Sequence, residues 1–268
     1  MRGVGGRIAI AICRVLAVVT PAAAGLPAWT SPVAGETVGA QADEPRPHFE
    51  FWVGASAFRN VWSIYSGTTV APFGSVQEDG ARLRLTGGYG EDRYSSQTPA
   101  GSRSFRGRGS FADLLIGYHA QLGNLTLKAF AGPTLADRQT TPSDPATTSL
   151  GMDWGGKAVL ETWWNIGERT WTAVDLSWAS LHDSYSARVR LGWRLTPAIS
   201  IGVEASAVGS EGSDIAGAGG FLRYETATGE LSFSGGVTND RLRENDGGLL
   251  GVTQSGTPIA TVSWLTRF

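Results

Sequence analysis

The tripeptide His182-Asp183-Ser184 is the grouping in this sequence that most resembles catalytic machinery. A histidine next to a serine hydroxyl can act as a base and activate the oxygen for attack on an ester. A two-residue spacing on a short polar turn also arises easily by chance, because aspartate and serine are common turn residues. We therefore expect an ordinary turn, and we keep a hydrolase using His182 and Ser184 as the alternative.

A second group of candidate residues consists of charges that alternate with apolar residues. Lys157 and Glu161 are four residues apart, so they share one face of an extended strand and could bind a sugar hydroxyl. Phe130, Trp163 and Trp171 share the face of such charges, and their rings could stack on a pyranose. The alternative, which we favour, is that the charges neutralise one another across strands, because an unpaired buried charge is costly. The charged candidates are Arg82, Arg84, Asp113, Lys128, Lys157, Glu161, Asp175, Arg188, Arg190, Arg194, Glu204 and Arg223.

The alternation indicates that β-strands position these side chains. Apolar and polar residues alternate from Tyr185 to Leu195 and again from Ile199 to Ala207, with a turn at Thr196-Pro197 between them. No window of similar length has the 3.6-residue period of a helix. The pattern predicts twelve strands, at residues 49–58, 62–71, 80–94, 110–121, 125–136, 151–164, 170–180, 185–195, 198–208, 215–226, 230–239 and 257–268.

The lengths of the connections separate the two ends of the predicted sheet. The fourth, sixth, eighth and tenth connections are short turns, whereas the long connections are all odd-numbered: Ser95–Gly109, Asp137–Leu150 and Asp240–Gly256. In an up-and-down sheet, odd-numbered connections share one end and even-numbered connections the other. Short turns at one end and long loops at the other are typical of outer-membrane barrels.

The N-terminal segment predicts export. Arg2 and Arg7 precede a short apolar run, and small-residue cleavage sites end at residues 24 and 42. We assign residues 1–42 to a signal peptide and leader, and residues 43–268 to one domain. Because Cys13 lies in the leader, the mature domain has no thiol. The formal net charge of −2 predicts no nucleic-acid partner, and we predict no metal or other cofactor.

The two faces of the predicted strands indicate a membrane barrel. A single soluble sheet would need a layer over its apolar face, and the sequence supplies none. Aromatic residues lie near strand ends, as in interfacial girdles: Tyr118, Trp164, Trp178, Tyr185 and Trp264. The last predicted strand ends in Phe268, similar to the closing strand of outer-membrane barrels. We predict a single up-and-down antiparallel transmembrane β-barrel of about twelve strands, with a soluble β domain as the alternative.

Four motifs follow in order along the chain, and together they resemble the cellulose biosynthesis protein BcsS family over roughly residues 49–268. They are Tyr65-Ser66-Gly67 with Ala71-Pro72-Phe73-Gly74; Glu78 to Arg84 with Gly87-Gly88-Tyr89-Gly90; Leu115 to Tyr118 with Leu127 to Gly132; and Gly156-Lys157 with Glu161-Thr162-Trp163.

The resemblance implies a non-enzymatic accessory of cellulose biosynthesis or secretion in the outer membrane of a Gram-negative bacterium. Its expected partners are outer-membrane lipid and either cellulose or components of the cellulose-synthase complex. No oligomeric state and no site residues follow from the family. The His-x-Ser spacing of the alternative hydrolase is similar to that of outer-membrane lipid A deacylases.

Overall fold

The computed structural model describes residues 46–58, 60–98, 101–143, 150–210, 213–242 and 254–268. The predicted signal segment, both cleavage positions and Cys13 lie outside these residues. The strands are β1 Phe49–Phe58, β2 Val61–Val70, β3 Gly80–Thr98, β4 Gly101–Leu122, β5 Leu125–Thr141, β6 Gly151–Asn165, β7 Thr170–Ala179, β8 Ser184–Arg194, β9 Ile199–Ser210, β10 Ser213–Thr226, β11 Gly229–Leu242 and β12 Gln254–Arg267. A three-residue 3-10 helix, Leu181–Asp183, joins β7 to β8. The described residues contain no helix that is long and apolar enough to cross a bilayer.

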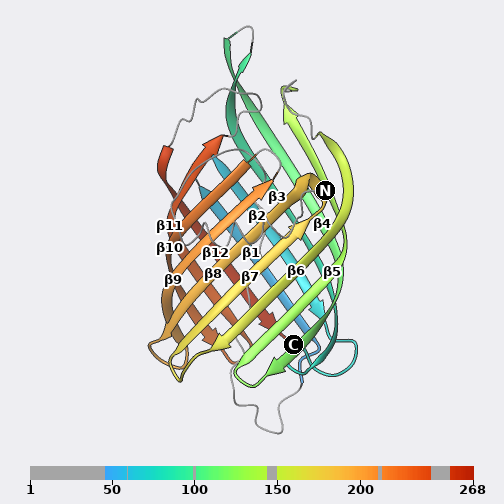
Figure 1. Cartoon of the computed structure of the whole chain (residues 1–268), viewed down its shortest axis with the longest axis vertical. Coiled ribbons are helices and arrows are strands. Elements are labelled where there is room, and N and C mark those ends of the chain that lie inside the picture. Colours follow the sequence, from blue (N-terminus) through green and yellow to red (C-terminus); the bar gives the residue numbers. More distant parts are fainter. Residues whose placement is uncertain (1–45, 59, 99–100, 144–149, 211–212, 243–253) are drawn as a thin grey trace, which may run out of the picture.

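The twelve strands form one closed antiparallel barrel (Figure 1). Each strand pairs with its neighbours in sequence, and β1 also pairs with β12. The N–H of Phe49 donates to the carbonyl of Phe268 at 2.9 Å, and the N–H of Phe268 donates to the carbonyl of Phe49 at 3.0 Å. The two ends of the strand order meet where β9 lies against β10, and there the N–H of Glu225 donates to the carbonyl of Ala198 at 2.7 Å. The predicted twelve-stranded up-and-down barrel is confirmed.

The outward face of the barrel is apolar. Along β4, Leu114 and Ile116 are 57% and 67% exposed, while the intervening Leu115 points inward and is 1% exposed. Of the predicted girdle residues, Tyr118, Trp164 and Trp264 are exposed on this face, and Trp178 and Tyr185 are half-buried. A closed sheet with large apolar side chains outside and charges inside is suited to a bilayer, where lipid covers the outer face.

The predicted long loops are shorter in the structure, because the strands beside them continue further than predicted. Strands β3 and β4 remain paired up to Thr98 and Gly101, so most of the predicted loop Ser95–Gly109 is a hairpin that continues above the barrel (Figure 1). Strand β5 likewise continues to Thr141. The outward face of β4 carries Arg106 and Arg108 instead of apolar residues in this stretch, while Phe105 on the inner face is buried and stacks on Tyr94. Backbone pairing needs no apolar outer face to continue.

Inward glycines make room for inward aromatic rings. A Cβ atom at Gly67 would overlap the ring of Trp52, and one at Gly192 would overlap the ring of Trp171. In both cases the ring lies over the glycine of the neighbouring strand. The high glycine content of the chain, 37 of 268 residues, therefore partly reflects how large rings are packed inside a narrow barrel.

Candidate functional site

The barrel lumen is the candidate site, because the structure turns all the predicted charged side chains toward it. Their strand parity is that of the buried inner face, opposite to the exposed apolar residues. Buried members are Arg82, Arg84, Asp113, Lys128, Glu161, Asp175, Arg190 and Arg223; half-buried members are Lys157, Arg188, Arg194 and Glu204.

One ion pair crosses the lumen between strands that are not neighbours. The guanidinium of Arg84 on β3 donates two hydrogen bonds to the carboxylate of Glu161 on β6, at 2.5 and 3.0 Å. The same guanidinium lies 3.7 Å from the ring centre of Phe130 and 5.0 Å from that of Trp52. Its Nε also donates to Thr69 at 3.1 Å. Arg84 thus connects β1, β2, β3, β5 and β6 through the inside of the barrel.

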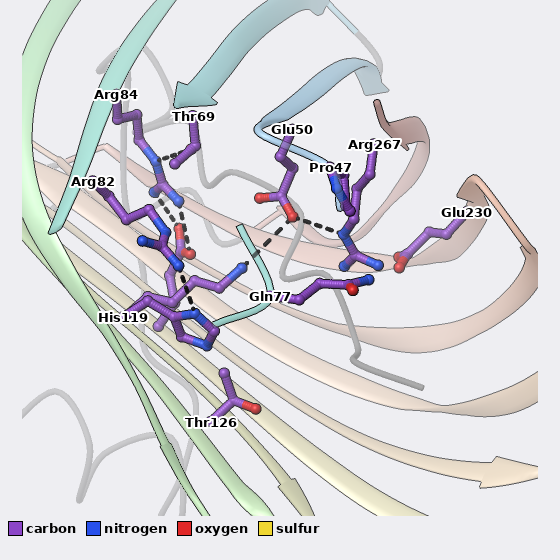
Figure 2. A network of polar contacts seen from close by, with 12 residues as sticks. Pro47, Glu50, Thr69, Gln77, Arg82, Arg84, His119, Thr126, Glu230 and Arg267 are labelled. Atoms are coloured by element: carbon purple, nitrogen blue, oxygen red, sulfur yellow. Dashed lines mark hydrogen bonds and ion pairs between the residues drawn. The ribbon is translucent and has the colours of Figure 1, made fainter. Parts of the chain in front are cut away.

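A second crossing joins β1 to β5. The carboxylate of Glu50 lies 3.6 Å from the ammonium of Lys128 and 3.1 Å from Nε of Arg267 (Figure 2). Sequence reasoning missed Glu50 and Arg267 as lumen residues. Glu50 shares its strand face with the buried Trp52. The two-residue alternation of the first strand was therefore the sequence signal that could have identified Glu50 as a lumen residue.

The remaining charged candidates also lie next to acidic or polar side chains of the lumen. Lys157 donates to Asp113 at 2.6 Å and Glu161 binds Arg84, so both ions that could have bound a sugar hydroxyl have charged protein partners instead. Arg190 lies 3.9 Å from Asp175. Arg188 lies directly opposite Asp175 on β7 and borders the same cavity as Glu204. Arg194 donates to Asn165 at 2.7 Å.

Stacked aromatic rings fill another part of the lumen. The rings of Trp163 and Trp171 are 3.9 Å apart, and Phe221 lies 5.4 Å from Trp171. The guanidinium of Arg223 on β10 lies 4.6 Å from the ring of Trp163 on β6, across the barrel. Arg223 in turn binds Glu225 and Glu230 at 2.5 and 2.6 Å. These rings face one another rather than an open channel.

The connection from Ala71 to Asp79 closes the mouth of the barrel at the end where Phe49 and Phe268 lie. The N–H of Val76 donates to the carbonyl of Pro47 at 2.8 Å, and Ser75 Oγ donates to the same carbonyl at 3.0 Å. Both Ser75 and Val76 are buried. Arg82 donates to the carbonyl of Ser75 at 2.9 Å and contacts Nδ1 of the fully buried His119 at 3.1 Å (Figure 2).

Small cavities lie between these side chains. One, of about 20 Å³, is bordered by Arg84, Asp113 and Glu161. Another, of about 90 Å³, is bordered by Tyr65, Arg188 and Glu204. Sites for small molecules usually measure about 300–1,000 Å³. Both cavities are smaller than this, and the lumen around them is occupied by the paired charges and stacked rings of the described residues.

The hydrolase candidates lie at the rim, on the connection between β7 and β8. His182 and Asp183 both have positive φ, 52° and 47°. His182 Nε2 lies 3.9 Å from Asp153, and Asp183 accepts a hydrogen bond from the indole of Trp178 at 3.1 Å. Within the described residues no hydrogen bond joins His182 to Ser184, so the imidazole is not oriented toward the hydroxyl that it would have to activate.

Several solved membrane proteins have a similar fold. The KdgM porin is 8% identical, with 82% of this chain and 99% of that chain covered and a TM-score of 0.44. The Pseudomonas putida toluene transporter TodX is 10% identical, with 84% and 89% covered and a TM-score of 0.45. The transport unit of the autotransporter AIDA-I from Escherichia coli is 10% identical, with 86% and 93% covered and a TM-score of 0.45. At these values nothing follows about function.

The sequence itself has one informative match. No curated protein is significantly similar to the chain. The family described as "Cellulose biosynthesis protein BcsS" matches residues 51–255, which begin in β1 and end in β12 and so include almost the whole barrel. The chain therefore belongs to the cellulose biosynthesis protein BcsS family.

Proposed function

We propose that the protein is a non-enzymatic outer-membrane barrel that assists cellulose biosynthesis or secretion. The observation that carries this proposal is the family match over residues 51–255, which coincides with a closed barrel that is apolar outside. The N-terminal segment, with Arg2, Arg7 and the apolar run that follows, serves export to the envelope. The partners are outer-membrane lipid and either cellulose or components of the cellulose-synthase complex.

We further propose that any glucan contact is confined to the end of the lumen that lies away from the closed mouth. Arg188 and Glu204 border the larger cavity together with the phenol of Tyr65, so they are the charged candidates nearest to free space. Arg84 and Glu161, in contrast, are bound to each other and surrounded by rings. A filled lumen favours a role in anchoring or organising the secretion machinery over a role as an open conduit.

A deletion strain complemented with single variants tests the proposal. Deletion should lower cellulose output, and wild type or Ser184→Ala should restore it, because no serine nucleophile is needed. Arg188→Gln should restore less cellulose output than wild type if glucan contacts the lumen. The matched control is Arg169→Gln, which removes one positive charge from an exposed turn at the closed end. Normal cellulose output in the deletion strain, or loss of output with a folded Ser184→Ala protein, would contradict the proposal.

A further inference from the structure

An outward-facing cluster of charges lies where β3 and β4 rise above the apolar band. We define the rim patch as Glu91, Arg93, Arg106 and Arg108. Glu91 pairs directly with Arg108 across the two strands, and Arg93 pairs directly with Arg106. Arg106 Nε donates to Glu91 at 2.9 Å, and Arg108 Nε lies 3.3 Å from the same carboxylate. Two guanidinium groups, those of Arg106 and Arg108, thus share one carboxylate, and the guanidinium of Arg93 has none within the described residues.

The rim patch has an excess of positive charge that the described residues do not balance. Like charges placed directly opposite on neighbouring strands are destabilising, and Arg93 and Arg106 are such a pair. The side chain of Arg93 is exposed and has no hydrogen-bond or ion-pair partner within the described part of the chain, although its backbone N–H donates to the carbonyl of Asn60. The side chains of Arg106 and Arg108 are 41% and 48% exposed, so their remaining donors are open to a ligand.

The next residues toward the bilayer make the surface amphipathic. The ring of Trp62 packs 5.7 Å from that of Tyr89, and the Tyr89 hydroxyl donates to Glu91 at 3.0 Å. Beyond them on the same face lie exposed Ile64 and Leu85. A ligand that follows this face meets cations first, then aromatic rings and then aliphatic side chains. This order matches a lipid with an anionic headgroup.

A groove beside the rim patch offers room for such a lipid. It has a volume of about 440 Å³ and lies beside the connection between β1 and β2, bordered by residues of both strands. Its outward walls include exposed Ala57, Trp62, Pro258 and Ala260, with Arg93 at its edge. Small apolar side chains leave space for an acyl chain, and the arginine lies where a headgroup begins.

We propose that the rim patch and this groove bind a phosphorylated lipid of the outer leaflet. Arginine favours phosphate, because its planar fork donates two parallel hydrogen bonds to the oxygens. Arg93 and Arg106 hold the phosphate between them, Arg108 remains paired with Glu91, and the acyl chains follow Trp62 into the groove. The inference rests on the proposed location in the outer membrane, which supplies such a lipid.

Binding of defined lipids to the full chain in nanodiscs tests the site. The probes are lipid A with both phosphates and lipid A with its phosphates removed, each titrated and followed by native mass spectrometry. We expect wild type to bind the phosphorylated form at least about tenfold more tightly, because charge-assisted hydrogen bonds are among the stronger ones. Arg93→Gln/Arg106→Gln should lose that preference. The control variant Arg46→Gln/Arg169→Gln loses the same number of positive charges at the opposite end of the barrel. It should keep the preference for phosphorylated lipid A.

The outcomes separate the lipid site from the proposed location. A protein that inserts and folds but binds both lipids equally, or keeps its preference after Arg93→Gln/Arg106→Gln, overturns the site alone. Competition by inorganic phosphate at the same concentration as the lipid would identify a free-anion site and overturn the lipid assignment. A protein that does not insert into the nanodisc at all speaks against the membrane location instead.

Discussion

Replacing Val189 by Arg should prevent stable folding of the barrel in a bilayer. Val189 lies at the midpoint of β8, points outward and is 40% exposed. A guanidinium on the lipid face near the bilayer midplane costs about 2–4 kcal/mol. We expect a loss of this size in the free energy of unfolding, measured by urea titration in vesicles, together with less of the folded form that migrates faster on an unheated gel.

Two variants control for this result. Val189→Thr keeps the shape of the side chain without a charge, so it should lower the stability far less than Val189→Arg. Arg190→Gln changes the next residue, which points into the lumen, and should still allow folding because Arg188 also faces Asp175. If Val189→Arg folds as well as wild type, that face is not in lipid.

Replacing Glu161 by Leu should be among the most damaging single changes inside the barrel. It leaves the guanidinium of Arg84, which is 2% exposed, without its carboxylate partner. Breaking a buried ion pair by removing one partner costs about 3–5 kcal/mol. The expected result is a loss of this order in the free energy of unfolding, measured by the same urea titration.

The double variant Arg84→Met/Glu161→Leu shows whether the loss comes from the stranded charge. Because replacing both members of a buried pair with apolar residues is often nearly neutral, we expect it to recover a large part of the stability. Arg84→Lys should be intermediate, since an ammonium cannot donate the two parallel bonds. A Glu161→Leu variant as stable as wild type would mean that water reaches Arg84 and that the lumen is not filled there.

The strands could be predicted because each carries its own two-residue period. The predicted hairpin at Thr196-Pro197 corresponds to β8 and β9, with both boundaries at the turn shifted by one residue. The inward position of Arg188 and Arg190 follows from the same period. The extension of β3 and β4 to Thr98 and Gly101 was missed because its outward face carries charges such as Arg106 and Arg108 in place of the apolar residues that mark the other strands.

The ion pairs inside the lumen could not be predicted from the sequence. Lys157 and Glu161 share a strand face, yet their ions bind Asp113 on β4 and Arg84 on β3. Which charges meet across a closed barrel depends on strand tilt and on side-chain length, not on spacing along one strand. The closing connection from Ala71 to Asp79 likewise has no period, and only its contacts with Pro47 and Arg82 show that it seals the mouth.

The electrical conductance of the purified protein in a planar lipid bilayer tests the central claim, a membrane barrel with a filled lumen, most directly. Because Glu50–Lys128, Arg84–Glu161 and Arg223–Trp163 each cross the barrel, wild type should insert without stepwise increases in current. The variant Trp163→Ala/Trp171→Ala/Phe221→Ala, which removes the stacked rings, is the one in which steps are expected. Stable conducting steps from wild-type protein would contradict the filled lumen and favour an open channel.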